Sequence, residues 1–377
     1  MLGQLRSALR RSRIVGVLGA RQVGKTTLAR ELAEASSATW FDLEDAADRT
    51  RLADPMLALR RQAGLIVIDE VQREPALFEP LRVLADRPRG ARFLLLGSAS
   101  PVLIRGTSES LAGRIEYVHL SGFALDEVGF ARWPRLWLRG GFPRSFAARS
   151  DLDSASWRRQ FIRTFLERDV AYLAEGAAAA TLERLWTMLA HWHGQILNVA
   201  ELARALGTSE PTIRRYIDVL AGTFMVRVLR PWHENLSKRQ VKSPKIYLAD
   251  SGLLHSLLGL DRQRDLDRHP TVGASWEGFA LEQVITRLGA VPENCFFWAT
   301  HQHAELDLMI VRGNRRRGFE FKLSDAPKVT TSMRIAMTDL KLDSLDVVHP
   351  GETTYPLAPR IRAVGIADLE TAIQPLR

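Results

Sequence analysis

The chain has 377 residues, 46% of them hydrophobic and 25% charged, which is ordinary for a globular protein with two or three separate cores. No apolar run approaches the ~18 residues that span a bilayer, and the first residues lack the apolar core of a signal peptide. We therefore expect a cytoplasmic protein without a membrane partner. The single Cys295 excludes an internal disulfide framework and a cysteine zinc site. The net charge of +9 fits a phosphate-rich partner, but an arginine-rich composition explains it equally well.

Residues 19–27 fit the phosphate-binding pattern G-x-x-x-x-G-K-[ST] at every fixed position. An apolar run at 14–18 precedes them and a helical pattern follows, which is the context that the pattern requires. We expect ATP and Mg²⁺ here, with Lys25 at the β- and γ-phosphates and the Thr26 hydroxyl on the metal. The alternative is a glycine turn that binds nothing. The nucleotide-binding residues expected in this loop are Gly19, Gln22, Val23, Gly24, Lys25, Thr26 and Thr27.

Two acids, Asp69 and Glu70, follow the apolar run at 65–68. Such a run predicts a strand buried on both faces of a parallel sheet, and ligands bind at the carboxyl ends of such strands. Asp69 fits the acid that organises Mg²⁺, and Glu70 fits the residue that orients or deprotonates the attacking water. A pair of helix-capping acids is the alternative.

Ser98 follows a second buried run at 92–97 and is our candidate for sensing the γ-phosphate, although a capping serine fits nearly as well. Arg114 follows a helical pattern that ends at glycine. It could act as an arginine finger, in its own site or in that of a neighbouring chain, or it could be a solvated cap.

These segments, together with residues 140–143 (Gly-Gly-Phe-Pro), occur in the order found in a prokaryotic group of AAA-like ATPases, which the chain resembles from about Gln4 to its C-terminus. The resemblance implies a parallel sheet with helices on both sides, followed by a helical lid and a distinctive C-terminal domain. It implies ATP hydrolysis more firmly than it implies a biological role.

Residues 198–220 predict two short helices joined by a glycine turn, followed by a strand hairpin, which is a winged helix-turn-helix pattern. Arg214 and Arg215 on the second helix suit a DNA duplex. The hairpin carries basic residues that we expect to form a wing for the same partner. Winged helices also serve as protein-binding or structural modules, so both readings stay open. The wing residues are Lys238, Arg239, Lys242 and Lys245.

The C-terminal third carries Asp307 on a predicted strand at 305–311, and Glu320 and Lys322 on the returning strand. An acid followed by Glu-x-Lys resembles the restriction-endonuclease-like nuclease core. The resemblance implies that Asp307 and Glu320 hold a divalent metal, that Lys322 polarises a water, and that Glu277, or less favourably Glu282, adds an acid from the preceding helix. A cross-strand salt bridge on an exposed face is the alternative. We also expect a helical run within 331–345 and a final strand near 361–364.

The expected fold class is α/β, and the sequence does not indicate the oligomeric state of the protein. Four domains are expected: an AAA-like P-loop domain at 1–138, a helical lid or connector at 139–190, a winged helix-turn-helix at 191–255, and a restriction-endonuclease-like domain at 256–377. The favoured function is an ATPase whose hydrolysis drives a C-terminal region acting on DNA. The alternative is a regulatory nucleotide-binding scaffold with an inactive, protein-binding C-terminal domain.

Overall fold

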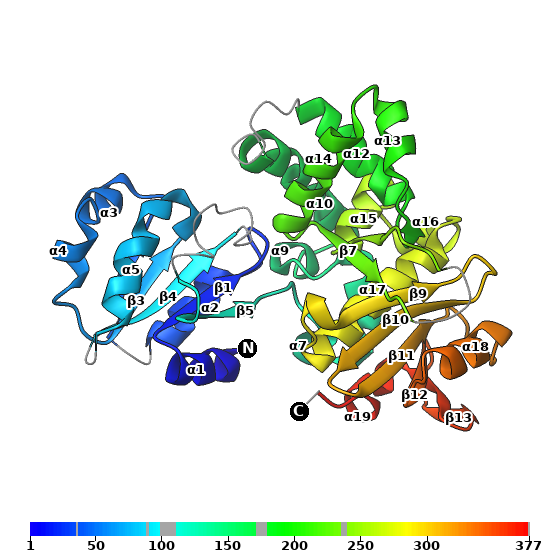
Figure 1. Cartoon of the computed structure of the whole chain (residues 1–377). Helices are drawn as coiled ribbons and strands as arrows, with labels where there is room; N and C mark the ends of the chain where they lie inside the picture. Colours follow the sequence, from blue (N-terminus) through cyan, green and yellow to red (C-terminus); the bar gives the residue numbers. More distant parts are fainter. Residues whose placement is uncertain (35–36, 88–89, 99–110, 171–178, 235–239, 376–377) are drawn as a thin grey trace. The chain divides into compact units, whose positions relative to one another are not determined.

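The computed structural model describes residues 1–34, 37–87, 90–98, 111–170, 179–234 and 240–375, without the side chains of 168–170 and 179. The chain forms two compact units. Unit 1 comprises Met1–Gly122 with Gly222–Phe224, and unit 2 comprises Phe123–Ala221 with Met225–Arg377. Figure 1 shows each unit with its own sheet.

Unit 1 is built on a five-stranded sheet in the order β2-β3-β4-β1-β5, with every neighbouring pair parallel. Its strands are β1 (Ile14–Leu18), β2 (Thr39–Asp42), β3 (Leu65–Asp69), β4 (Arg92–Gly97) and β5 (Ile115–His119). Its helices are α1 (Leu2–Arg11), α2 (Lys25–Glu34), α3 (Ala46–Arg51), α4 (Pro55–Leu59), η1 (Val71–Arg73), η2 (Pro75–Leu77) and α5 (Phe78–Ala85).

The sheet of unit 1 is covered on both faces because successive residues of each buried strand point to opposite sides. In β3, Ile66 and Ile68 join the core that contains α5, whereas Leu65 and Val67 join the core that contains α1 and α2. Every residue of β1 and β3 is buried. The predicted parallel sheet with helices on both sides is confirmed.

Unit 2 begins with a helical part. Its elements are α7 (Leu125–Val128), η3 (Phe130–Arg132), α8 (Trp133–Arg139), α9 (Pro143–Phe146), α10 (Asp151–Thr164), η4 (Phe165–Val170), α12 (Ala179–His191), α13 (Val199–Leu206), α14 (Glu210–Gly222), α15 (Ser251–Leu257) and α16 (Gln263–Asp267). The two helices predicted to form a helix-turn-helix are α13 and α14. Asn198 caps α13 by accepting a hydrogen bond from the Glu201 amide, and Gly207 ends the helix in the left-handed region.

A nine-stranded sheet runs through the rest of unit 2 in the order β13-β14-β12-β11-β10-β9-β7-β8-β6. The strands are β6 (Gln195–Ile196), β7 (Val226–Pro231), β8 (Lys245–Leu248), β9 (Cys295–Ala299), β10 (Glu305–Arg312), β11 (Arg315–Phe321), β12 (Ser344–His349), β13 (Tyr355–Ala358) and β14 (Ile361–Gly365). The remaining helices are α17 (Val272–Leu288), η5 (Pro292–Asn294), α18 (Thr331–Asp339), η6 (Ile366–Asp368) and α19 (Leu369–Ala372).

The β7–β8 hairpin, which the sequence predicted to be a wing, and the C-terminal strands share this sheet. Strand β7 pairs in parallel with β9 at Arg230↔Phe296, and the Trp232 amide donates a 2.7 Å hydrogen bond to the Phe297 carbonyl. The sequence pattern did not predict this continuity. It brings residues of β8 into the neighbourhood of β10 and α17.

The helical run predicted within 331–345 is α18, which ends at Asp339, and strand β12 begins after it at Ser344. Lys341, with φ of 52°, reverses the chain between them, so Leu340 and Leu345 belong to different elements. The strand predicted at 361–364 is β14.

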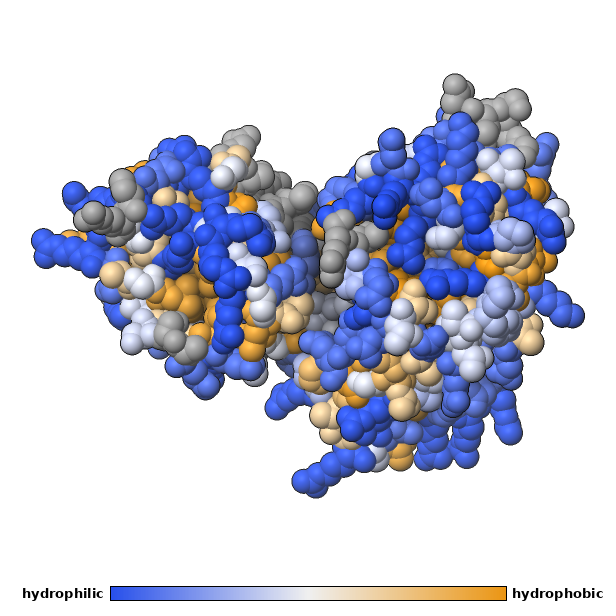
Figure 2. All heavy atoms as spheres, turned by 90° about the horizontal axis from the view of Figure 1, so that it is seen from below, coloured by the Kyte–Doolittle hydropathy of each residue, from blue (hydrophilic) through white to orange (hydrophobic). Residues whose placement is uncertain are grey.

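Hydrophilic residues cover most of the face seen in Figure 2, with apolar residues in small scattered groups. Among the described residues, no helix is long and apolar enough to cross a membrane.

Candidate functional site

The phosphate loop connects the carboxyl end of β1 to the first turn of α2. Gln22 and Gly24 adopt φ of 62° and 104°, which curls the backbone. At Gly19 a Cβ atom would lie 2.1 Å from the Leu120 carbonyl oxygen, so only glycine fits where the loop leaves the sheet. This is the local geometry that a phosphate-binding loop needs.

The Lys25 side chain lies inside this loop and is only 5% exposed. Its Nζ atom donates hydrogen bonds of 2.9 Å to the carbonyl oxygens of Gly19 and Ala20. These carbonyls hold the ammonium group beside the loop backbone, within the concave path that phosphates occupy in such loops.

Thr26 and Asp69 connect the loop to the end of β3. The Thr26 hydroxyl donates a 2.8 Å hydrogen bond to Oδ2 of Asp69, and the Glu70 amide donates a 3.0 Å hydrogen bond to Oδ1. Burial raises the pKa of Asp69, the hydrogen bond from Thr26 lowers it, and the charge of Glu70 raises it. A hydroxyl and a carboxylate are oxygen ligands of the kind that Mg²⁺ prefers, so the residues present fit that metal.

Glu70 is held by two polar neighbours. Its backbone is in the left-handed region (φ 54°), which is uncommon for a residue with a side chain and concentrates at functional sites. The Ser98 hydroxyl donates a 3.1 Å hydrogen bond to Oε2 of Glu70, and the Gln72 amide group donates to both Glu70 and Ser98, the latter at 2.9 Å. Gln72 was not singled out from the sequence, although its place two residues after the acid was a usable signal.

Arg114 lies at the opposite end of the sheet. Strand β5 starts at Ile115, which pairs with Ile14 at the amino end of β1, whereas the loop follows Leu18 at the carboxyl end. Five strand residues span roughly 16 Å. Arg114 instead pairs with Asp86 on the exposed surface, with Nε 2.7 Å from Oδ1. The finger role in its own site is therefore incompatible with this position, and the role in a neighbouring chain stays a prediction.

In unit 2, the four residues predicted for the nuclease-like site come together. Lys322 Nζ lies 2.7 Å from Oε2 of Glu320 and 3.6 Å from Oδ2 of Asp307. The Phe321 amide donates a 3.0 Å hydrogen bond to the same Asp307 oxygen, which fixes that carboxylate against β11. Glu277 of α17 joins them through Lys245.

Lys245 was assigned from the sequence to a basic wing facing DNA, and this placement was wrong. The residue is 4% exposed, and its side chain points into the acids. Its Nζ atom lies 3.3 Å from Oε1 of Glu277 and 3.9 Å from Oδ1 of Asp307, and it also pairs with Glu305. The Tyr247 hydroxyl donates a 2.6 Å hydrogen bond to Oε1 of Glu277. Lys245 reaches these acids because β8 and β10 belong to the same sheet, which brings β8 close to α17 and β10. We call these residues the acidic cluster: Lys245, Tyr247, Glu277, Glu305, Asp307, Glu320 and Lys322.

The electrostatics of the acidic cluster are those of closely packed like charges. Burial and the charge of Asp307 raise the pKa of Glu277 and of Glu320 well above the usual range. Two lysines hold the carboxylates, and among the described residues no group of three acids, histidines or cysteines is arranged to hold a metal ion. The carboxylates are suitable ligands in kind, but Lys245 stands between them, so the present arrangement does not fit a metal.

The other acid considered on α17, Glu282, has a separate partner. Its carboxylate binds the Arg227 guanidinium through two contacts, one of them 2.7 Å. Glu277, the favoured residue, is the one that reaches the acidic cluster.

The residues predicted to contact DNA, apart from the buried Lys245, are exposed where the structure describes them. Arg214 and Arg215 lie on the exposed face of α14, where Arg214 pairs with Glu210 at 3.4 Å. Lys242 is exposed. Lys238 and Arg239 lie outside the described residues.

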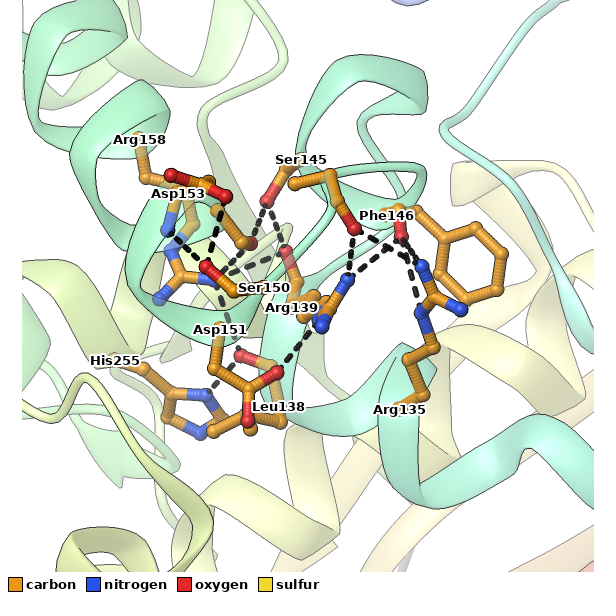
Figure 3. Close-up of polar contacts among 12 residues, drawn as sticks. Arg135, Leu138, Arg139, Ser145, Phe146, Ser150, Asp151, Asp153, Arg158 and His255 are labelled. Carbon is orange, nitrogen blue, oxygen red and sulfur yellow. Dashed lines mark hydrogen bonds and ion pairs between the residues drawn. The ribbon is translucent and has the colours of Figure 1, made fainter.

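The Gly140–Pro143 segment is fixed by a polar network rather than by a ligand. The Gly141 amide donates a 2.7 Å hydrogen bond to Oδ2 of Asp250, whose other oxygen caps α15. Figure 3 shows the neighbouring contacts. Arg139 binds Asp151 at 2.7 Å, and the fully buried Arg158, whose pKa burial lowers to about 10, binds Ser256 at 2.8 Å. These contacts tie α8, α10 and α15 into one body.

Known proteins match the chain along most of its length. Residues 11–129 match the family described as an AAA domain, and residues 131–264 and 272–369 match two domains of unknown function, DUF8612 and DUF4143. The chain is 53% identical to uncharacterized protein Rv2008c of Mycobacterium tuberculosis and to uncharacterized protein Mb2031c of Mycobacterium bovis, over 96% of this chain and 82% of each relative. The Walker-type ATPase PABY2304 of Pyrococcus abyssi is a similar solved structure, with 13% identity and a TM-score of 0.46 over 68% of this chain and 94% of that chain. The chain thus belongs to the family of these mycobacterial proteins, and it is an ATP-binding P-loop ATPase of the AAA type with a C-terminal domain of unknown function.

Proposed function

We propose that unit 1 hydrolyses ATP with Glu70 as the residue that orients and deprotonates the attacking water. The observation that carries this proposal is the direct contact between Thr26 and Asp69, which joins the phosphate loop to the acids of β3. Lys25 binds the β- and γ-phosphates from within the loop. Ser98 and Gln72 hold the Glu70 carboxylate in one orientation, and Ser98 responds to the γ-phosphate.

Thr26 and Asp69 are the residues that would hold Mg²⁺. When bound, the metal neutralises the negative charge of the phosphate oxygens. Burial is the largest cause of the raised pKa of Asp69, and the hydrogen bond from the Thr26 hydroxyl opposes it.

Substitution of Thr26 tests this metal assignment. Thr26→Ala removes the hydroxyl that would ligate Mg²⁺. This substitution should lower Mg²⁺-dependent ATP turnover by at least about tenfold, because the metal loses one of its protein ligands. Thr26→Ser keeps the hydroxyl and should retain turnover within a few-fold. If Thr26→Ala hydrolyses ATP as fast as the wild type, the assignment is wrong.

For unit 2 we propose that hydrolysis drives a region that acts on DNA, and that the acidic cluster is its candidate cleavage site. The support is the convergence of Glu277, Asp307, Glu320 and Lys322. The present arrangement, with Lys245 between the carboxylates, does not fit a metal.

The alternative scaffold function also has a specific observation in its favour. Lys245 neutralises carboxylates from α17 and β10, which makes the acidic cluster an internal network joining the wing hairpin to the C-terminal strands. Breaking a buried charge network typically destabilises a protein by about 3–5 kcal/mol. On this account Lys245→Met lowers the thermal stability of unit 2, and the wild type cuts no DNA.

A cleavage assay separates the two accounts. Single- and double-stranded DNA are incubated with Mg²⁺ or Mn²⁺, with and without ATP, and the wild type is compared with Asp307→Ala and Lys322→Ala. The nuclease account expects cutting by the wild type that both substitutions abolish. Cutting that survives both substitutions comes from a contaminant and rejects the nuclease account.

A salt titration tests DNA binding through α14 and the wing. Each lost phosphate contact should reduce the slope of log K against log salt by about one. We expect Arg214→Ala, Arg215→Ala and Lys242→Ala each to do so. The control is Arg264→Ala, which removes a comparably exposed arginine on α16. If all variants, including Arg264→Ala, give the same slope of log K against log salt, α14 and the wing do not bind DNA phosphates.

A further inference from the structure

Unit 2 contains a pocket of about 1050 Å³ at the turn between β10 and β11, which no part of the proposed function uses. Four arginines line it together with Gln374 and Pro375 of the C-terminal segment, and none of the lining residues is acidic. Figure 1 shows the C-terminal end of the chain and the β10–β11 hairpin at the same end of unit 2. The four arginines are Arg287, Arg312, Arg315 and Arg317.

The hairpin places three of these arginines on one face. Arg312 lies directly across the hairpin from Arg315, and Ile310 lies across from Arg317. Because side chains alternate along a strand, the three arginines and Ile310 lie on the same face of the hairpin. Like charges directly opposite each other destabilise a sheet. A bound anion would offset the repulsion between Arg312 and Arg315.

Two of the four arginines, Arg287 and Arg317, are held in place before any ligand arrives. Arg287 near the end of α17 donates to the carbonyls of Ile373 and Glu370, at 2.9 and 2.7 Å, and pairs with Asp126 at 3.1 Å. Arg317 binds Asp346 at 3.1 Å, and its guanidinium carbon lies 5.3 Å from the centre of the Phe319 ring. A guanidinium fixed in this way loses little side-chain entropy on binding.

The acids that pair with the two fixed arginines are partly shared. Asp346 also binds Arg362, at 2.6 Å, so it balances only part of the charge of Arg317. Arg315 is exposed at the hairpin. The arginines come from α17 and from both strands and surround a hollow, instead of forming a stripe along a groove. That arrangement suits a compact anion better than an extended backbone.

We propose that this pocket binds a compact polyphosphate, the chemical class that includes inorganic tripolyphosphate and the phosphate tail of a nucleotide. Guanidinium forks match phosphate oxygens in geometry, and the pocket volume is that of a small-ligand site. Arg312 and Arg315 close on the anion from the hairpin, and Arg287 and Arg317 receive it from fixed positions.

The test is calorimetric titration of inorganic tripolyphosphate into the full chain carrying Lys25→Ala, which weakens binding at the phosphate loop of unit 1. In this background, Arg312→Ala/Arg315→Ala should bind at least about tenfold more weakly, the effect of losing one charged hydrogen bond or more. Arg334→Ala, which removes an exposed arginine of α18 outside the pocket, should bind as the parent does. Unfolding temperatures equal to that of the parent show that the variants are folded.

Three results would overturn the proposal. One is the absence of tripolyphosphate binding in the Lys25→Ala background. Another is an unchanged affinity in the double variant. The third is a weakening by Arg334→Ala as large as that by the double variant, which would indicate general attraction to basic surface. A parallel arm uses duplex DNA: if only DNA loses affinity in the double variant, the arginines bind a phosphodiester backbone and the compact ligand is rejected.

Discussion

The hydroxyl of Ser98 donates a 3.1 Å hydrogen bond to Oε2 of Glu70, across from the end of one strand to the end of the next. Ser98 and Glu70 were separate candidates in the sequence, and the contact makes them parts of one arrangement. Gln72 contacts both side chains and completes it.

Ser98→Ala should therefore lower kcat for ATP by about tenfold or more, since orientation of a catalytic base typically contributes that much, with little change in KM. The measurement is steady-state turnover over a range of ATP concentrations. A serine that only caps the chain after β4 would change thermal stability and leave kcat unaltered, and that outcome would remove Ser98 from the site.

Gly140 and Gly129 form a matched pair for testing the network around Asp250. Both have positive φ, 76° and 90°, but an added Cβ at Gly140 would lie 2.2 Å from Oδ1 of Asp250, whereas at Gly129 it meets nothing within 4 Å. Gly129→Ala should cost about 1 kcal/mol from backbone strain alone. Gly140→Ala should cost on the order of 3 kcal/mol, because Asp250 is fixed by two backbone amides and cannot move away. Denaturant unfolding of both variants measures the difference, and equal losses would contradict the account.

Acid should destabilise unit 2 through two buried histidines. Burial lowers the pKa of His193 and His255 to about 3. The Leu248 amide donates to Nδ1 of His193, which must stay unprotonated to accept it. Between about pH 6.5 and 3 the unfolded chain binds protons at these histidines that the folded chain refuses, so the contribution of each histidine to stability falls as the pH falls, by at most about 1.4 kcal/mol per pH unit. Glu277 and Glu320, whose pKa values burial raises, contribute in the opposite direction, so the histidine contribution is measured as the change of slope in a histidine variant.

Unfolding free energies measured between pH 7 and 4 check this dependence. His255→Gln should reduce the slope, while His191→Gln, which alters an exposed histidine on α12, should leave it unchanged. If His191→Gln reduces the slope of unfolding free energy against pH as much as His255→Gln does, the buried His255 is not the source of that slope.

Arg114 gives a prediction about assembly. Because it lies at the amino end of β5, we expect any finger role to be played in the site of a neighbouring chain. Arg114→Ala should then lower turnover, and adding Glu70→Gln chains, which supply Arg114 but have no catalytic base, should restore it. Loss of turnover without rescue would place the effect inside one chain, and unchanged turnover would make Arg114 a surface residue.

The sequence predicted most where neighbours in the chain are also neighbours in space. The phosphate loop, the acids after β3 and the two helices α13 and α14 depend on local patterns, and their elements were found within a few residues. The Glu320–Lys322 contact is local in the same sense.

Lys245 was misplaced because its environment depends on distant segments. Its partners lie on α17 and β10, and the strand that carries it joins a sheet through the β7–β9 pairing, which no local pattern reports. One signal was present in the sequence. Ile246 and Leu248 alternate with Lys245 and Tyr247, so the strand has one apolar face and one polar face. When both faces of such a strand are buried, the lysine needs acids as partners.

The central claim is that Glu70 acts in ATP hydrolysis and not in ATP binding. The most direct measurement combines ATP affinity with single-turnover hydrolysis in the wild type and in Glu70→Gln, which keeps the size of the side chain and removes its basicity. We predict an affinity within a few-fold of the wild type and a hydrolysis rate reduced by about 10²-fold or more. Hydrolysis at the wild-type rate in Glu70→Gln would contradict the account.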